Sequence, residues 1–203
     1  MRQNRIGHRY SLRPVTVGGA AAAGGIVAGT PVATPQGWCA VERLAPGDSV
    51  LTFEAGPQPL GRVARAAAAR LLRVPQGALD NRAALVLTAG QGVLIESDSA
   101  EALYGDPFAL IPALALDGFR GIAPAPRRMA RAVILGFDLP QIVYASRAVL
   151  LACPGACAGT GLDALRQRAA RAETPLLPLD QARALVACLI AEDVGAALRR
   201  RWA

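Results

Sequence analysis

The residues that could carry nucleophilic or metal chemistry in this chain are four cysteines and one histidine. Cys153 and Cys157 are separated by three residues, and no second Cys or His pair lies near them, so their spacing disfavours a zinc site. Cys39 and Cys188 stand alone. A chain of this length and apolarity does not depend on a disulfide scaffold. We therefore expect reduced thiols in a cytoplasmic protein that needs neither a metal nor a cofactor.

Three carboxylates, Glu96, Asp98 and Glu101, gather near the middle of the sequence. We expect Glu96 at the end of a strand and the other two around a helix start, where the helix dipole favours negative charge. This is the pattern of a surface acidic patch. The glycine pairs 18–19 and 24–25 match neither a dinucleotide-binding motif nor a P-loop. The sequence therefore contains no recognisable cofactor-dependent catalytic motif.

Positive charge is concentrated at the two ends of the chain. All 22 basic residues are arginines, and the formal net charge is +7. The end arginines are Arg2, Arg5, Arg9, Arg13, Arg199, Arg200 and Arg201. The remaining arginines balance the 15 acidic residues, so the body is neutral. The arginines at the two ends indicate weak contact with a polyanion. The alternative is that they only keep the protein soluble.

The uncharged run over residues 17–29 is 13 residues of mostly Gly and Ala. It is too short and too weakly apolar to span a bilayer. We interpret residues 1–24 as a basic flexible arm with a Gly/Ala linker, and we expect no membrane span.

Residues 25–54 predict a β-meander. Three short segments with alternating side chains, 30–34, 38–41 and 49–53, are separated by the turn signals Pro35-Gln36-Gly37 and Ala45-Pro46-Gly47-Asp48. Short strands joined by tight turns are typical of a mainly β domain.

The order of these pieces resembles the first block of the Hint (hedgehog/intein) superfamily, and especially its bacterial members that are not inteins. The matching positions are Gly29-Thr30, Thr34, Gly37, Val41-Glu42, Leu44, Pro46-Gly47-Asp48 and Val50-Leu51-Thr52, followed by Leu87-Thr88, Leu110-Ile111-Pro112, Phe137-Asp138 and Ile142-Val143-Tyr144. The resemblance spans roughly residues 25–154. It implies a compact fold of short twisted strands and an activity of self-catalysed protein cleavage or splicing.

In that family a Cys or Ser attacks the preceding carbonyl, and a Thr and a His in the next block hold the scissile amide and protonate its nitrogen. A second His assists the later step. In this chain the catalytic positions of the family correspond to Gly25, Thr88, Gln91 and Pro140. Among these four positions, only Thr88 has the residue type that the family uses there. Gln91 cannot exchange a proton at neutral pH, and Pro140 has no side-chain donor or acceptor.

Replacement groups are scarce. No residue of 17–29 has a hydroxyl or thiol, so a small shift of the alignment supplies no nucleophile. The single histidine, His8, precedes the scissile position. Cys39 is expected to be a half-buried strand thiol, and Cys153 has no base beside it, so only a few per cent would be thiolate at neutral pH.

Later elements complete a mainly β, Hint-like fold with a C-terminal helix. We expect strands at 84–87, 93–96, 108–111, 131–137, 142–145 and 149–152, and a short helix over 100–104 capped by Ser97 or Ser99. Residues 60–74 have the local propensity of a helix, but the family continues there with a strand, which we adopt. Asp180 is expected to cap the last helix, with Leu185, Val186, Leu189 and Ile190 on its apolar face.

These observations divide the chain into an arm (1–24), a Hint-like domain (25–158) and a helical extension (159–203). They favour a domain that has lost self-cleavage and acts as a structural or protein-binding module. The former cleft near Gly25, Thr88 and Gln91 is the expected ligand site. Two alternatives remain: residual autoproteolysis with an unorthodox nucleophile, and polyanion binding through the arginine-rich ends.

Overall fold

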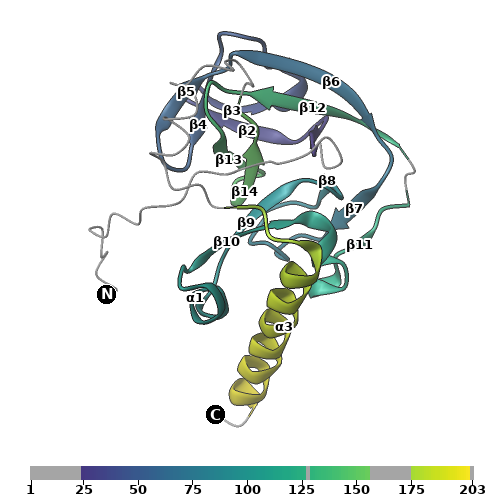
Figure 1. Ribbon diagram of the computed structural model, residues 1–203. Helices are drawn as coiled ribbons and strands as arrows, with labels where there is room; N and C mark the ends of the chain where they lie inside the picture. The colour runs from purple at the N-terminus through teal and green to yellow at the C-terminus, as the bar shows by residue number, and fades with distance from the viewer. Residues whose placement is uncertain (1–23, 127–128, 156–174, 202–203) are drawn as a thin grey trace.

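The computed structural model describes residues 24–126, 129–155 and 175–201. Its strands form two sheets in which all pairings are antiparallel (Figure 1). The first sheet has the order β11-β7-β8-β1-β12-β6. Its strands are β1 (Ile26–Val27), β6 (Arg62–Ala68), β7 (Leu71–Val74), β8 (Leu85–Thr88), β11 (Ala123–Pro124) and β12 (Ala130–Gly136).

The second sheet has the order β10-β9-β14-β13-β2-β3, and β4 joins it by pairing with both β13 and β5. Its strands are β2 (Pro31–Thr34), β3 (Gly37–Ala40), β4 (Ser49–Thr52), β5 (Gly56–Pro59), β9 (Gly92–Glu96), β10 (Phe108–Pro112), β13 (Gln141–Ala145) and β14 (Val149–Cys153). The strands expected from the sequence are confirmed to within about two residues at each end, and so is the mainly β fold class.

The opening meander forms because its turns carry the right residues. β2 and β3 pair from Pro31 to Ala40 around the Pro35-Gln36 turn. The Thr34 hydroxyl donates a 2.7 Å hydrogen bond to the Gly37 carbonyl, which closes this turn. The 3-10 helix η1 (Val41–Arg43) follows, and Glu42 in it accepts a 2.7 Å hydrogen bond from Gly29 N. This bond joins the Gly-Thr and Val-Glu motifs that are far apart in the sequence.

The conflict over residues 60–74 is decided in favour of strands. β6 pairs along its whole length with β12, from Arg62 opposite Gly136 to Ala68 opposite Ala130. Alanine favours helices in isolation, but antiparallel pairing with β12 at seven positions satisfies the backbone groups on one side of the strand. Cross-strand pairing therefore overrides local propensity here.

Apart from η1, the helices and 3-10 turns of the described residues lie toward one end of the body (Figure 1). They are α1 (Asp98–Tyr104), η2 (Ala113–Leu116), η3 (Phe119–Gly121) and α3 (Leu179–Arg201). Ser97 caps α1 as expected, because its hydroxyl accepts a 3.0 Å hydrogen bond from Ala100 N, and Gly105 ends the helix in the left-handed conformation. Among the helices in the described ranges, none combines the length and apolarity that crossing a bilayer requires.

The helix α3 packs on the body through its apolar face. Leu185, Val186 and Leu189 are buried in the main core, as the sequence predicts, but Ile190 is 42% exposed. The position of Asp180 also differs from its prediction as a cap. The helix begins at Leu179, so Asp180 lies in the first turn, where its charge still complements the helix dipole.

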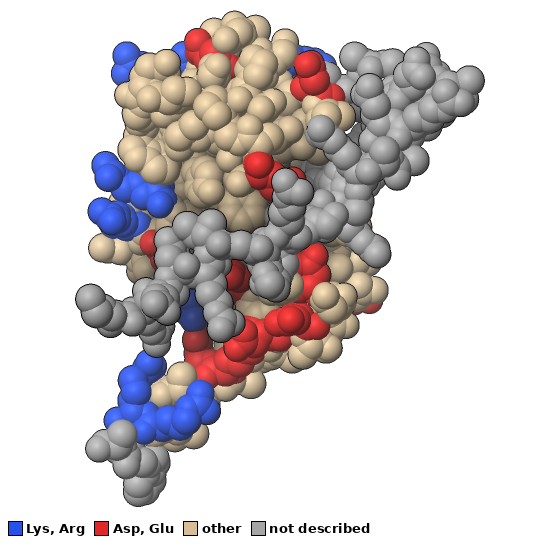
Figure 2. Space-filling model, turned by 90° about the vertical axis from the view of Figure 1, so that its left-hand side faces the viewer, with Lys and Arg blue, Asp and Glu red and all other residues tan. Residues whose placement is uncertain are grey.

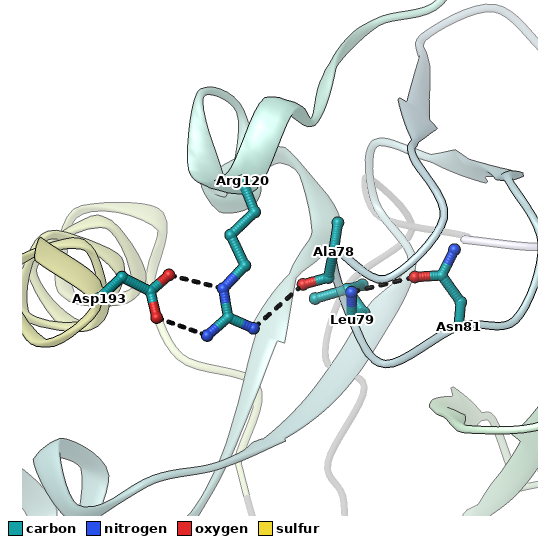
Figure 3. Close-up of polar contacts among 5 residues, drawn as sticks. All are labelled: Ala78, Leu79, Asn81, Arg120 and Asp193. Carbon is teal, nitrogen blue, oxygen red and sulfur yellow. Dashed lines mark hydrogen bonds and ion pairs between the residues drawn. The ribbon is translucent and has the colours of Figure 1, made fainter. Parts of the chain in front are cut away.

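Polar contacts hold α3 beside α1 and η3. Arg120 of η3 binds Asp193 of α3 through two 2.6 Å N–H···O bonds and also reaches the Ala78 carbonyl at 3.5 Å (Figure 3). Tyr104 of α1 donates from its hydroxyl to the Gln181 carbonyl at 3.2 Å. The division of the chain near residue 158 falls outside the described ranges and stays a prediction.

Candidate functional site

Thr88, at the end of β8, contacts the residue at the expected nucleophile position. Gly25 N donates to Thr88 Oγ1 at 3.3 Å, and the Thr88 hydroxyl donates to Gly25 O at 3.2 Å. Both residues are buried, and Thr88 is 5% exposed. The nitrogen of Gly25 belongs to the Gly24-Gly25 peptide bond, so a threonine hydroxyl lies against the amide that the resemblance marks as scissile.

Gly24 is held in a position that no other residue could take without movement. A Cβ on Gly24 would lie 2.4 Å from Gln91 Cα and 2.7 Å from the Gly90 carbonyl oxygen. Moving these backbone atoms to relieve the overlap would cost stability, because the protein interior is closely packed. The structure thus places Gly24 in the site, one residue before the expected start of the domain. The Gly24-Gly25 pair was the sequence signal for this close approach.

Gly25 lacks a nucleophile, and its surroundings are filled by β12. A Cβ on Gly25 would lie 3.0 Å from Ala132 Cβ, 3.3 Å from Ile134 Cγ1 and 3.3 Å from the Val133 carbonyl oxygen. A Ser or Cys here would require neighbours to give way by a few tenths of an ångström. The space that a nucleophilic side chain needs is therefore partly occupied by apolar atoms.

The side chain of Gln91 is engaged with β14 and does not face the cleft. Its Nε2 donates to Ala152 O at 2.7 Å and to Gly92 O at 3.1 Å, and the residue is 1% exposed. Its Oε1 is buried and has no hydrogen-bond partner among the described residues. Gln91 therefore approaches Gly24 through its backbone only, which corrects the expectation that its side chain lines the cleft.

The cleft itself measures about 410 Å³. Gly25, Thr88 and Gly90 line it, together with small side chains of β6. The sequence anticipated only Gly25 and Thr88 of its lining; the residues it missed include Arg70 before β7, Leu114 of η2 and Leu179 at the start of α3. No local pattern identifies these three, because backbone hydrogen bonds of Ala89 to Arg70 and to Leu114, and the docking of α3, bring them together. The described lining is thus mostly apolar and includes one cation, Arg70.

Pro140 lies at the other end of the matching region. A Cβ on Gly155 would lie 2.7 Å from Pro140 Cδ, so the two residues are in close contact. Phe137 N donates to Pro154 O at 3.2 Å in the same place. Pro140 fills the space beside this segment without offering a donor or acceptor.

The thiols of the described residues are unpaired and do not join Thr88. Cys153 is buried, and burial raises the pKa of its thiol to about 12, so it is protonated at neutral pH. Cys39 is half-buried in β3 and makes a 3.6 Å contact to its neighbour Ala40 O. Cys188 is half-buried on α3. Cys157 and His8 lie outside the described residues.

The described part of the chain contains no group of three or more His, Cys, Asp or Glu placed to hold a metal ion. Acidic side chains gather over the lower part of the face in Figure 2, beside the arginines at the end of α3. Arg199 and Arg200 are exposed there, whereas Arg2, Arg5, Arg9 and Arg13 and the side chain of Arg201 are outside the described residues.

The chain is similar to solved intein structures and to one protein-family model. The MchDnaB-1 intein crystal structure is similar over 63% of this chain and 98% of its own, with 15% identity and a TM-score of 0.43. The solution structure of a bacterial intein-like domain from Clostridium thermocellum covers 63% of this chain and 96% of its own, with 19% identity and a TM-score of 0.43. Among curated proteins none matches the sequence. The family model of the Hint domain matches residues 25–150, which is more than half of the chain, and the protein therefore belongs to the Hint domain family.

Proposed function

We propose that this chain is a Hint domain, of the bacterial non-intein kind, that does not cleave itself and acts as a protein-binding or structural module. The observation that carries the proposal is the Thr88–Gly25 contact. The threonine that holds the scissile amide in this family is in hydrogen-bond contact with Gly25, which has no side chain to attack with.

The chemistry needs a nucleophile and a proton donor, and neither is supplied at this contact. Gln91 faces β14, its amide does not titrate, and the described residues that line the cleft include no histidine, cysteine or carboxylate. Residual autoproteolysis would require another nucleophile, either one of the thiols Cys39 and Cys153 or the Thr88 hydroxyl. The Cys39 thiol donates a 3.6 Å hydrogen bond to the carbonyl of its strand neighbour Ala40. The raised pKa of Cys153 keeps its side chain protonated.

The direct test is intact-mass spectrometry of the purified chain during incubation with dithiothreitol and with hydroxylamine, both of which cleave thioesters. The expected result is a single species at 21.0 kDa throughout. A product that begins at Gly25 would overturn the proposal. If such a product forms, replacing Cys39, Cys153 and Thr88 in turn identifies the nucleophile.

The protein-binding part of the proposal assigns the partner to the cleft. Small side chains of β6 form a wall against which a polypeptide can pack, and Arg70 supplies one charge. A photo-crosslinking amino acid in place of Ala67, a wall residue, should capture a partner in the native host cell. The same group in place of Arg183, on the exposed side of α3, is the control. Equal capture at both positions would argue against the cleft.

Weak polyanion contact through the chain ends is a second candidate. It is supported by exposed Arg199 and Arg200 at the end of α3, where no described acidic residue forms an ion pair with them. Binding to heparin or nucleic acid should be salt-sensitive and should vanish when residues 1–14 and 199–203 are removed. Binding that survives truncation would place the contact on the body.

The compartment is proposed to be the cytoplasm. Cys39, Cys153 and Cys188 are unpaired in the described structure, which suits a reducing environment. A secreted form carrying a disulfide would contradict this assignment.

A further inference from the structure

A second cleft, of about 540 Å³, lies outside the Thr88–Gly25 site. Its walls come from the segment around β1, from β8 and the loop before it, and from the turn between β13 and β14. Three arginines line it, Arg73, Arg82 and Arg147, together with the hydroxyl residues Thr30 and Ser146. No aspartate or glutamate is among the described residues that line it.

The cleft opens where two neighbouring strands of one sheet separate. β1 and β8 pair at Ile26 opposite Leu87, and this is the single pair between them in the described sheet. Beyond it, Val27 on one strand and Val86 on the other both line the cleft. A sheet that parts in this way leaves room for an extended segment to enter between the strands and pack against the buried Val27 and the half-buried Val86.

The arginines that line the cleft are available for a ligand. All three are exposed, and among the described residues none of them has an ion-pair partner. The guanidinium of Arg147 lies 5.9 Å from the Trp38 ring centroid, a contact that leaves its N–H groups free for an anion. One carboxylate contacts the wall of the cleft without lining it, because Glu42 accepts a 2.7 Å hydrogen bond from the N–H of Gly29.

The turn that carries Arg147 is held in an unfavourable conformation. Ser146 and Arg147 both have positive φ angles, 46° and 73°, which non-glycine residues adopt rarely. A hairpin turn with two positive φ values ordinarily uses Asn and Gly. Such strain persists where surrounding structure or function maintains it, and here it places a guanidinium at the cleft.

We propose that this cleft binds an extended acidic peptide segment, with apolar side chains against Val27 and Val86 and carboxylates on Arg73, Arg82 and Arg147. Arginine suits this role because its planar group binds a carboxylate through two parallel hydrogen bonds. The mixed lining favours a peptide over a lone inorganic anion, because much of the wall is apolar. This site does not depend on the function proposed for the Thr88–Gly25 cleft.

The test uses the full chain and a fluorescent hexapeptide of alternating valine and glutamate, blocked at both ends. Fluorescence anisotropy should show binding that weakens as salt is raised. The triple variant Arg73→Gln/Arg82→Gln/Arg147→Gln should bind at least about tenfold more weakly. The matched variant Arg43→Gln/Arg62→Gln/Arg183→Gln removes the same charge outside the cleft and should change binding by less than about twofold.

Several outcomes would overturn the proposal. They are absence of binding by the parent chain, equal losses in the two triple variants, or equal binding of a valine-lysine peptide. Full displacement of the peptide by inorganic phosphate at equal ionic strength would show a site for lone anions and would also reject the peptide. Because all six arginines are exposed, both variants should keep the parent melting temperature, which circular dichroism checks.

Discussion

The hydroxyl of Thr88 lies within hydrogen-bond distance of both the nitrogen and the oxygen of Gly25, 3.3 Å and 3.2 Å away, although 63 residues separate the two in sequence. Gly25 directly precedes β1, and Thr88 is the last residue of β8. One hydroxyl therefore satisfies both the N–H and the carbonyl of Gly25 where the two paired strands meet. In this protein the Thr88 hydroxyl therefore has a structural role, because it links the start of β1 to the end of β8.

Replacing Thr88 by Val should destabilise the domain by about 1–3 kcal/mol. Valine has the same shape, but it leaves the buried amide and carbonyl of Gly25 without a partner. Urea denaturation followed by circular dichroism measures the free energy of unfolding. Thr88→Ser keeps the hydroxyl and should cost clearly less. A Val variant as stable as the parent would mean that water or another group replaces the hydroxyl.

Replacing Gly24 by Ala should cost roughly 2 kcal/mol or more, because its Cβ would lie 2.4 Å from Gln91 Cα. Gly61→Ala is the matched control. A Cβ there would meet nothing nearer than Asp138 Oδ1 at 3.6 Å, so the cost should be small. Equal unfolding midpoints for the two variants would show that the segment before Gly25 is not packed as described.

Restoring a nucleophile should not restore cleavage. Gly25→Cys places a thiol at the position that the resemblance assigns to the nucleophile, but no imidazole of the described residues contacts it, and its Cβ would lie 3.0 Å from Ala132 Cβ. We expect no dithiothreitol-dependent product by mass spectrometry and a loss of about 1–3 kcal/mol in stability. Adding Ala132→Gly should relieve the crowding, so the two changes should be non-additive. Cleavage of the Cys variant would show that the rest of the catalytic machinery is intact.

The ion pair between Arg120 and Asp193 should contribute about 0.5–1 kcal/mol, because both side chains are roughly 40% exposed and solvent screens them. The pair lowers the pKa of Asp193. A lowered pKa in the folded state stabilises the fold at pH values above the ordinary range near 3.8, and this contribution is lost as the pH falls through the lowered value. A double-mutant cycle with Arg120→Gln and Asp193→Asn at pH 7 should show the coupling.

The same cycle measured at a pH below the pKa of Asp193 should show almost no coupling, since the carboxyl is then protonated. Coupling that is unchanged by acid would mean that the contact acts as a neutral hydrogen bond. Such a result would leave the docking of α3 intact but remove its electrostatic component.

Cys153 should be the slowest to react of the thiols in the described residues. Its burial raises its pKa to about 12, so little thiolate is present near pH 8. Cys39 and Cys188 are both half-buried and should react with iodoacetamide first. Peptide mapping at successive times gives the order, and labelling in urea, where burial is removed, should equalise the rates. Early labelling of Cys153 in the folded protein would contradict its burial.

Local turn chemistry and side-chain alternation were enough to predict the opening meander, because Pro, Gly and Asp at the turns restrict the backbone directly. The Ser97 cap and the end of α1 at Gly105 were predictable for the same reason. The identities of residues 25, 91 and 140 also predict, without any structure, that the family's nucleophile and histidines are replaced, and this stays a prediction. These are properties of single residues and their immediate neighbours.

Other features were decided by contacts between distant segments. Residues 62–68 have helix-forming alanines but form a strand, because β12 offers seven paired positions. The direction of the Gln91 side chain depends on a carbonyl of β14 that lies 61 residues away. Arg73, Arg82 and Arg147 line one cleft only because β7, the loop before β8 and the β13–β14 turn meet there. Sequence determines which groups are present, whereas long-range pairing and packing determine which of them meet.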